Sequence, residues 1–543
     1  MSPDRPDRVP VLIAGGGIVG LSASLFLSRQ EVPSLLVERH PGTSIHPRSR
    51  GVNGRTMELY RELGIDERVR EAGRALAPAL GLYVGPSLLE IVEPLPRERK
   101  VGHNPFTQVL EDLSPVSASR GTQDLIEPVL VEAARERGGD LRFHTQLRGF
   151  EQDGEGVTAT LFDRDRGEEW TVHADHMIAA DGANSGAFHA LGAPCSGAGV
   201  LGHMLNILFR LDLTDLVHGR EFSICDIERS ELRGLMTSIN NTDRWVFHLV
   251  YRPSRGERAE DYTASRCVEL LRLALGMPDA DPEILGILPW EPTVRVADRF
   301  RWARVFLAGD AAHQMPPWGG QGANTGIQDV HNLAWKLAAV RSGTAQDALL
   351  DTYDEERRPV GRVAAEESGM AAGEDGMMLL QGGGEAIRQR WPRMIGYGYQ
   401  YRSRAISHEP GDELPTDELG LDGRPGTRCP HAWVERPDGT RVSTLDLGAG
   451  GWTLLAASDG TAWCEAAAAR DLTAYRIGPD GDVGDADDAW RARAGLEPDG
   501  ALLIRPDGFV AWRARTAETD PAGRLGEALD RALCRTPATD RAG

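Results

Sequence analysis

The stretch Val11-Leu-Ile-Ala-Gly15-Gly-Gly17-Ile-Val-Gly20 decides the fold of this 543-residue chain. Its apolar start is typical of a buried parallel strand, and the pattern from Leu21 to Leu27 is typical of a helix. In such a strand-turn-helix, Gly15 permits the tight turn and Gly17 lets backbone N–H groups approach a pyrophosphate. Gly20 lets the helix pack closely on the strand. The stretch therefore predicts a dinucleotide-binding domain.

An acidic residue ends the next apolar run, Leu35-Leu-Val37. Glu38 stands at the distance where a carboxylate accepts hydrogen bonds from the ribose diol of a bound dinucleotide. We assign Glu38 and the neighbouring Arg39 to the cofactor site. A plain strand-turn-helix would explain the glycines alone, whereas Glu38 at this spacing favours a bound dinucleotide.

A second glycine-containing run, Val305-Phe-Leu-Ala-Gly-Asp310-Ala-Ala-His313, lies far along the chain. It again reads as a buried strand that ends at a glycine. Met315-Pro-Pro-Trp-Gly-Gly-Gln-Gly-Ala-Asn324 follows, and we expect a helix from about Thr325. An NAD dehydrogenase has no use for this second segment, so the two runs together favour FAD.

In this order the two runs resemble the class A aromatic hydroxylases, the para-hydroxybenzoate hydroxylase and phenol hydroxylase family. The resemblance implies noncovalent FAD, whose ribityl chain Asp310 would bind. Pro317 would lie beside the isoalloxazine in a loop that includes Gly320. Backbone amides for the pyrimidine edge would come from Gly322, Ala323 and Asn324, at a helix start that favours negative charge on reduced flavin.

Two further segments are similar to that family. His46-Pro-Arg48-Ser-Arg-Gly-Val-Asn-Gly-Arg-Thr-Met57 resembles its arginine segment, in which Arg48 would contact the FAD pyrophosphate. Ser119-Arg-Gly-Thr-Gln123-Asp-Leu-Ile-Glu-Pro resembles its glutamine segment. There Gln123 would bind the ribityl or phosphate region, and Arg120 would lie close by. A surface arginine and an ordinary helix cap are the alternatives.

His176-Met-Ile-Ala-Ala-Asp181-Gly182-Ala-Asn-Ser185 is similar to the family's Asp-Gly motif, in which Asp181 would contact both flavin and nicotinamide coenzyme. Ala180 replaces the usual glycine, and Phe188 stands where the family has an arginine. A lost arginine removes a fixed charge and five N–H donors. Either coenzyme binding suffers, or Phe188 packs under the FAD domain and the coenzyme phosphate is held elsewhere.

Composition limits the function classes. The net charge of −21 disfavours nucleic acid and anionic membranes, because a phosphate-binding surface needs clustered Lys and Arg. Six cysteines without CxxC or zinc spacing suit a reducing compartment and predict no metal site. No apolar leader precedes the first strand, and no apolar stretch reaches the roughly 18 residues of a membrane span. We expect a cytoplasmic protein, monomeric or homodimeric.

The order of segments predicts an α/β fold with a doubly wound, Rossmann-type FAD domain made of residues 1–190 and 295–400. Residues 191–294 contain alternating β-rich runs, Leu205–Leu211 and Arg244–Tyr251, and a helical stretch at Ala264–Leu275. By resemblance they form an inserted substrate-binding domain with an antiparallel sheet. Gln381-Gly-Gly-Gly384 and Gly423-Arg-Pro-Gly426 are expected loops or hinges.

Residues 410–543 resemble the C-terminal, thioredoxin-like domain of longer family members. Trp452-Thr-Leu-Leu455 predicts one strand, and Gly500–Trp512 predicts a hairpin that turns at Pro506-Asp-Gly508. Dithiol exchange needs a neighbouring pair of cysteines, which this region lacks. We interpret it as a structural or interaction domain.

The resemblance implies a monooxygenase in which NADPH, rather than NADH, reduces FAD transiently and dioxygen forms a flavin C4a-hydroperoxide that hydroxylates an aromatic ring. The Pro-Arg-Ser-Arg-Gly segment and the length are similar to hydroxylases of aromatic polyketides, used in antibiotic biosynthesis. A Baeyer–Villiger monooxygenase, a catabolic phenol hydroxylase and a non-catalytic FAD-binding protein remain alternatives. Tyr251, His248 and Arg295 are candidates for acting on the substrate phenol, but each lies on a strand-like pattern, so the catalytic residue is unknown.

Overall fold

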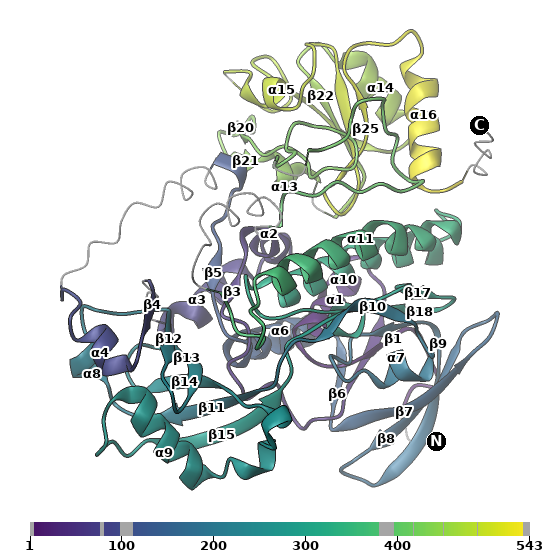
Figure 1. The fold of residues 1–543 in the computed structure, drawn as a ribbon. Helices are drawn as coiled ribbons and strands as arrows, with labels where there is room; N and C mark the ends of the chain where they lie inside the picture. The colour runs from purple at the N-terminus through teal and green to yellow at the C-terminus, as the bar shows by residue number, and fades with distance from the viewer. Residues whose placement is uncertain are drawn as a thin grey trace.

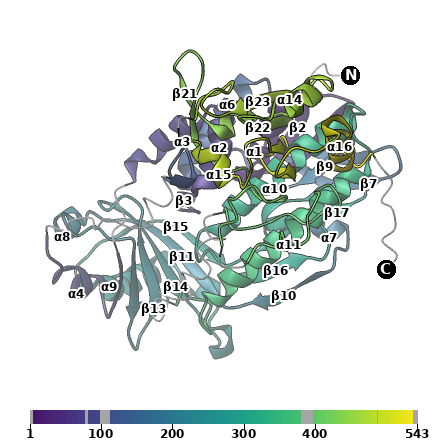
Figure 2. The same ribbon diagram turned by 90° about the horizontal axis from the view of Figure 1, so that it is seen from above.

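The computed structural model describes residues 5–76, 81–97, 112–379, 396–415, 418–448, 450–485 and 487–535. Figure 1 shows a layered body at the centre, a second sheet at the lower left and a C-terminal part at the top. Seen from above, the second sheet extends away from the helices of the layered body (Figure 2). The expected hinge at residues 381–384 lies outside the described residues.

The first sheet carries the strand that precedes the glycine run. Its strands follow the order β17-β18-β9-β1-β2-β6, and every pair from β18 to β6 is parallel. Apolar residues fill β1 and β18 because a parallel sheet is buried on both faces. The strands are β1 (Arg8–Ala14), β2 (Ser34–Glu38), β6 (Asp140–Phe143), β9 (Glu168–Ala179), β17 (Arg301–Trp302) and β18 (Val305–Leu307), with β7 (Thr145–Gln152) and β8 (Val157–Asp163) antiparallel to β9.

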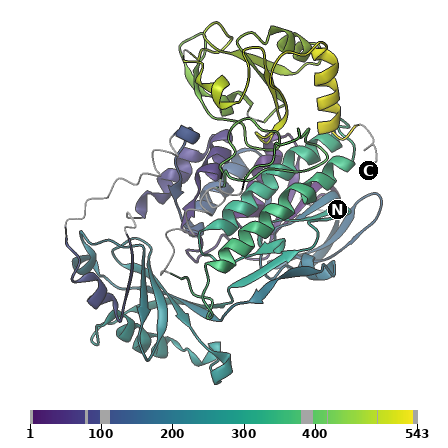
Figure 3. The same cartoon turned by 45° about the horizontal axis from the view of Figure 1, so that its top comes forward.

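Four helices pack against one another beside this sheet: α1 (Ile18–Arg29), α6 (Gln123–Glu136), α10 (Gln321–Arg341) and α11 (Ala348–Met370). Helix α1 contacts α6 and α10, and α10 contacts α11. Figure 3 shows α10 and α11 between the C-terminal part and the sheets. Helix α10 begins at Gln321, four residues before the predicted start. Glycine has a low helix propensity, so the glycines at this end of the helix gave no sign of a helical turn in the sequence.

Short elements place the arginine and glutamine segments next to each other. Strand β3 (Gly51–Val52) pairs with β5 (Ser119–Arg120), so two segments separated by a long stretch of chain become neighbours. Other short elements of this region are α2 (Gly54–Glu62), α3 (Asp66–Ala72) and α7 (Gly186–Ala190). A small sheet of β10 (Cys195–Val200), β16 (Thr293–Ala297) and β19 (His313–Gln314) leads from the first sheet to the second.

The second sheet has the order β15-β11-β14-β13-β12-β4. Its antiparallel strands are β11 (Met204–Arg210), β12 (Ile224–Glu228), β13 (Arg233–Ser238), β14 (Arg244–Val250) and β15 (Glu283–Trp290). The edge strand β4 (Leu82–Gly85) pairs in parallel with β12, although its residues fall inside the range 1–190 expected for the FAD domain. Sequence spacing gives no sign of this pairing.

The two faces of the second sheet differ in character. On one face Leu205, Phe247 and their neighbours form an apolar core with α9 (Ala264–Leu275) and α4 (Leu88–Val92). Because successive side chains of a strand point to opposite faces, Asn206 and His248 lie on the other face. The second sheet therefore turns a partly polar face away from its own helices.

The C-terminal part contains a four-stranded sheet of order β23-β22-β24-β25. Strand β22 (Thr453–Ala457) leads through α14 (Thr461–Ala468) to the parallel strand β23 (Thr473–Ile477). Strands β24 (Ala501–Ile504) and β25 (Val510–Ala514) form the predicted hairpin, and α16 (Pro521–Ala532) follows and packs on α14. Outside this sheet lie β20 (Trp433–Glu435), β21 (Arg441–Ser443), α13 (Thr444–Gly448) and α15 (Ala489–Arg493).

Buried charged side chains at the turn of the β24–β25 hairpin contact the layered body. Arg505 donates to both oxygens of Glu356 at 2.6 and 2.8 Å, and Lys336 donates to Glu356 at 2.8 Å. All three side chains are fully buried. Asn332 donates to Asp507 at 3.2 Å, so α10, α11 and the hairpin share one ionic network.

Candidate functional site

The glycine run forms a tight loop that leaves no room for side chains at two positions. Gly15 has φ +108°, and a Cβ there would lie 2.2 Å from the carbonyl oxygen of Ala180. A Cβ on Gly20 would lie 1.9 Å from the carbonyl oxygen of Gly15. Gly17 is the N-cap of α1, where a helix N-terminus offers free N–H groups to a phosphate.

Glu38 is fixed at the end of β2 beside this loop. Its Oε2 accepts from the N–H of Gly16 at 2.7 Å, and its Oε1 accepts from the N–H of His40 at 2.8 Å. A carboxylate has about four lone-pair sites, so acceptor capacity remains for a ribose diol. Arg39 is exposed and donates to the ring of His40 at 3.3 Å.

The structure brings Arg48, Arg120 and Gln123 together. The N–H of Gln123 donates to the carbonyl oxygen of Arg48 at 2.9 Å, and Arg120 is the β5 partner of Gly51. The Arg48 side chain is exposed, and burial lowers the pKa of Arg120. These two arginines place positive charge on the paired segments of an otherwise acidic protein, as an anionic cofactor requires.

Glu127, which our sequence interpretation missed, lies at the start of α1. It is buried, accepts from the N–H of Ser44 at 2.7 Å and from the Gln123 amide at 3.3 Å, and its Oε1 lies 3.7 Å from a Cβ built on Gly17. Burial raises its pKa to about 7. The only signal in the sequence is its spacing of four residues from Gln123 on α6.

Asp310 lies on a turn that a buried cluster of charged and polar side chains stabilises. Its own carboxylate is exposed and accepts from no donor of the described residues. The N–H of the preceding Gly309 donates to Asp329 at 3.2 Å, and Asp329 also accepts from His313 at 2.7 Å and from Arg357 at 2.8 Å. Burial alone would raise the pKa of Asp329, but its contacts with His313 and Arg357 lower it.

The start of α10 offers N–H groups beside Asp310. Pro317 and Gly320 are exposed, and Gly320 has φ +65° as the N-cap. Gly322 and Ala323 occupy the first turn, where backbone N–H groups have no partner within the helix. Asn324 has another task, because its side chain accepts from the N–H of Asn53 at 3.0 Å and donates to the carbonyl oxygen of Gly320 at 2.8 Å.

Asp181 shapes the loop that packs against Gly15. Its two oxygens accept from the Ser185 hydroxyl at 2.5 Å and from the N–H of Ala187 at 3.1 Å, so its carboxylate caps the start of α7. Phe188 on this helix is buried, and Arg295 lies over its ring. The predicted Asp-Gly segment is thus adjacent to the glycine loop.

Together these segments fit FAD. The glycine loop allows the close approach that a pyrophosphate needs, the carboxylates of Glu38 and Asp310 could accept from sugar hydroxyls, and the N–H groups at the α10 start could act as donors. Among the residues the structure describes, no group of three side chains could hold a metal ion. None of the described helices is long and apolar enough to cross a membrane.

The three candidates for substrate chemistry separate in space. His248 lies on the polar face of the second sheet, where its Nδ1 is 2.6 Å from Asn206 Oδ1. Tyr251 belongs to the opposite, apolar core and packs on Tyr262. Arg295 lies on β16 and donates to the carbonyl oxygen of Ala183. Of the two candidates in the second sheet, His248 and not Tyr251 lies on the face that meets the flavin loop.

The polar face of the second sheet meets the flavin loop and the arginine segment. The ring centres of Trp290 and Trp318 lie 6.5 Å apart, and Trp318 follows Pro317 in the loop. Arg50 donates to the carbonyl oxygen of Ser223 at 2.9 Å and to that of Ser238. Burial lowers the pKa of Arg50 to about 10.

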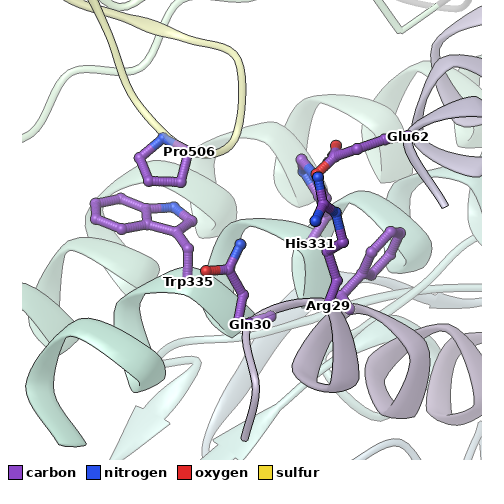
Figure 4. A pocket seen from close by; sticks show the side chains of 8 residues that line it. Arg29, Gln30, Glu62, His331, Trp335 and Pro506 are labelled. Carbon is purple, nitrogen blue, oxygen red and sulfur yellow. Dashed lines mark hydrogen bonds and ion pairs between the residues drawn. The ribbon is translucent and has the colours of Figure 1, made fainter. Parts of the chain in front are cut away.

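A separate small pocket lies at the other end of α1 (Figure 4). Nε2 of His331 lies 3.1 Å from Oε2 of Glu62 there, and Pro506 of the C-terminal hairpin covers Trp335. The pocket adjoins the last turn of α1, about 16 Å along the helix from the glycine loop. It is therefore distinct from the cofactor site.

Comparison with known proteins identifies the two parts of the chain. Residues 8–368 match a family model described as an FAD binding domain, and residues 422–536 match one described as aromatic-ring hydroxylase, C-terminal. The chain is 43% identical to a putative polyketide hydroxylase of Streptomyces halstedii, over 96% of this chain and 97% of that protein. It is 40% identical to tetracenomycin A2 monooxygenase-dioxygenase of Streptomyces glaucescens, over 98% of both. A crystal structure of aklavinone-11 hydroxylase with FAD and aklavinone superposes with a TM-score of 0.85 at 37% identity, covering 97% of this chain and 99% of that one.

Proposed function

Since this chain belongs to the FAD-binding aromatic-ring hydroxylases, which are FAD-dependent monooxygenases, we propose that it hydroxylates a polycyclic phenol of the aromatic polyketide type. Full-length similarity to hydroxylases that act on such molecules supports this substrate class. The observation that carries it is the polar face of the second sheet, which meets the flavin loop through Trp290 and Trp318.

When bound, FAD supplies hydride acceptance from a nicotinamide coenzyme and the activation of dioxygen. The chain binds and orients it. The α1 start and Arg48 would hold the pyrophosphate, Glu38 the ribose and Asp310 the ribityl hydroxyls. The free N–H groups of Gly322 and Ala323 would meet the flavin ring. We propose NADPH as the coenzyme, with Arg295 beside the Asp181 loop as a charge for its phosphates.

Water exclusion comes from apolar side chains at the junction of the second sheet and the flavin loop. Met204, Leu235 and Val250 of the sheet pack with Trp318 of the loop and with Met377. All five are buried. A dry site beside the flavin protects oxygen chemistry from side reactions with water.

We propose that residues 410–543 form a thioredoxin-like unit without dithiol chemistry. The order β23-β22-β24-β25, with α14 between two parallel strands and α16 at the end, supports this assignment. Burial raises the pKa of Cys429 to about 12 and that of Cys464 to about 11, so neither thiol is activated. The unit then acts through its contacts with α10 and α11.

The test is to supply FAD-loaded protein with NADPH, dioxygen and a panel of polycyclic phenols. We expect NADPH oxidation to accelerate when a phenol binds, and one ¹⁸O atom from ¹⁸O₂ to enter an aromatic C–H position of the product. A lactone would indicate Baeyer–Villiger chemistry instead. Equal NADPH oxidation with and without every phenol, with all oxygen recovered as hydrogen peroxide, would contradict the proposal and favour a non-catalytic flavoprotein.

A further inference from the structure

The hydrogen bonds around Asn206 fix which nitrogen of His248 carries a proton. The indole N–H of Trp290 only donates and lies 2.5 Å from the side-chain oxygen of Asn206, so that atom is an acceptor. His248 Nδ1 lies 2.6 Å from the same oxygen and must donate to it as well. Nδ1 therefore carries a hydrogen.

The second ring nitrogen of His248 is left as an acceptor. Burial, together with the nearby Arg50 and His46, lowers the pKa of His248 to about 3, so the ring is neutral and Nε2 carries a lone pair. The Thr237 hydroxyl lies 3.2 Å from Nε2 and also 3.2 Å from the carbonyl oxygen of Val246. The Thr237 hydroxyl donates its single proton to the Val246 carbonyl, so the lone pair of Nε2 remains for a ligand donor.

The position of His248 adjoins the cofactor site on two sides. Asn206 and His248 are paired across β11 and β14, and Trp290 connects Asn206 to Trp318 in the flavin loop. On the other side lies the arginine segment, which Asn324 ties to the start of α10 through Asn53. His248 is half-buried, while its neighbours in the strand, Phe247 and Leu249, are buried.

We propose that Nε2 of His248 accepts the hydrogen bond of a substrate hydroxyl and thereby selects a free phenol over its methyl ether. This inference rests on the proposed hydroxylase function. Trp290 and Asn206 act as positioning residues, because they impose the acceptor form of the ring. The carbonyl oxygens of Ser223 and Ser238 hold Arg50 on this side of the sheet, where its positive charge acts on His248. The substrate proton stays on its oxygen while the hydrogen bond orients the ring.

The test uses FAD-loaded protein and two probes, 1,8-dihydroxyanthraquinone and its dimethyl ether, titrated by the change in flavin absorbance. We expect the wild type to bind the free phenol about tenfold more tightly than the ether, the scale of one hydrogen bond. His248→Asn keeps an N–H for Asn206 but has no acceptor at Nε2, so the preference should vanish. His248→Gln can place a carbonyl oxygen at Nε2 and should keep most of it.

Trp290→Phe provides a second variant, which removes the indole N–H and keeps an aromatic ring at that position. Without the indole N–H, the Asn206 amide can flip and His248 can change tautomer, so the preference for the free phenol should fall. An unchanged preference in His248→Asn, or equal losses in the Asn and Gln variants, would overturn the role of His248. Failure of the wild type to bind either probe would overturn the substrate class as well.

Discussion

The guanidinium of Arg295 lies 4.7 Å from the centre of the Phe188 ring and donates to the carbonyl oxygen of Ala183 at 2.9 Å. Phe188 is the position where the family resemblance leads us to expect an arginine. A positive charge is therefore present beside the Asp181 loop, but β16 supplies it. Phe188 is only 6% exposed, and its ring forms a cation–π contact with the Arg295 guanidinium.

Phe188→Arg should lower the melting temperature of the FAD-loaded protein without tightening NADPH binding. The new guanidinium would be buried and would lie against the like charge of Arg295, so both desolvation and repulsion oppose it. Thermal denaturation and NADPH titration measure the two effects. Tighter NADPH binding at an unchanged melting temperature would mean that the family arginine is needed here.

Arg295→Met should weaken NADPH binding by about 1–2 kcal/mol, the scale of one charge-assisted hydrogen bond. Arg295 forms no ion pair with an acidic side chain among the described residues, so its charge is available to a phosphate. Arg299→Met is the matched control, because Arg299 is exposed, lies four residues after Arg295 and also packs on an aromatic ring, that of Trp302. Equal NADPH affinity in both variants would count against a coenzyme role for Arg295.

Asp310→Ala should reduce FAD affinity about tenfold or more. Sugar hydroxyls of the cofactor would lose their acceptor, which costs roughly 1–3 kcal/mol. Asp310→Asn keeps an oxygen acceptor and should lose less. FAD titration of the apoprotein distinguishes the two, and unchanged affinity in the alanine variant would show that the ribityl chain lies elsewhere.

Glu127→Gln should change how stability depends on pH. The folded protein raises the pKa of Glu127 from 4.5 to about 7, so the folded state binds more protons than the unfolded chain across that interval. The wild type therefore loses stability as pH rises from about 4.5 to 7, by up to about 3 kcal/mol, and the loss levels off above. The glutamine variant should lack this component.

Denaturation of the apoprotein at pH 5 and pH 8 measures the difference. Glu132→Gln, an exposed position on the same helix, should follow the wild type. The variant should also bind FAD more tightly at pH 8, because the negative pyrophosphate no longer meets a second negative charge at the α1 start. A glutamine variant with the wild-type pH dependence would show that Glu127 is not the group responsible.

Arg505→Met should destabilise the protein by about 3–5 kcal/mol, because Glu356 and Asp507 would remain buried without their strongest partner. Arg515→Met removes an exposed arginine further along the hairpin and should cost about 1 kcal/mol or less. Urea denaturation measures both. A cost below that of Arg515→Met would show that the buried network does not hold the C-terminal part to α11.

Local spacing predicted the strand, turn and helix of the glycine loop, and tertiary contacts explain what it missed. The strand, turn and helix around Gly15 follow from residues that are neighbours in sequence. The predicted start of α10 lies four residues too late. Its first turn is stabilised by the hydrogen bond from the backbone N–H of Asn53 to the Asn324 side chain, which helix propensity does not reveal. Asp329, which holds the Asp310 turn from behind, reads in the sequence as an ordinary helix residue.

The substrate side was harder to predict than the cofactor side. The alternation in β11 and β14 indicated a sheet, but it could not show which face meets the flavin loop. Tyr251 and His248 looked equivalent in the sequence and lie on opposite faces in the structure. Asn206 and Trp290, whose hydrogen bonds distinguish His248, lie on other strands. No short stretch of the sequence therefore contains all three residues.

Strand β4 has a consequence for attempts to exchange parts between related enzymes. The second sheet takes its edge strand from residues 82–85, and a long stretch of chain separates them from the other strands of that sheet. A transplanted segment cut at 191–294 would leave this strand behind and expose the backbone groups of β12 to solvent or to another chain. A chimaera that alters substrate choice must therefore carry two pieces of sequence, and a recombination map drawn along the linear chain would separate them.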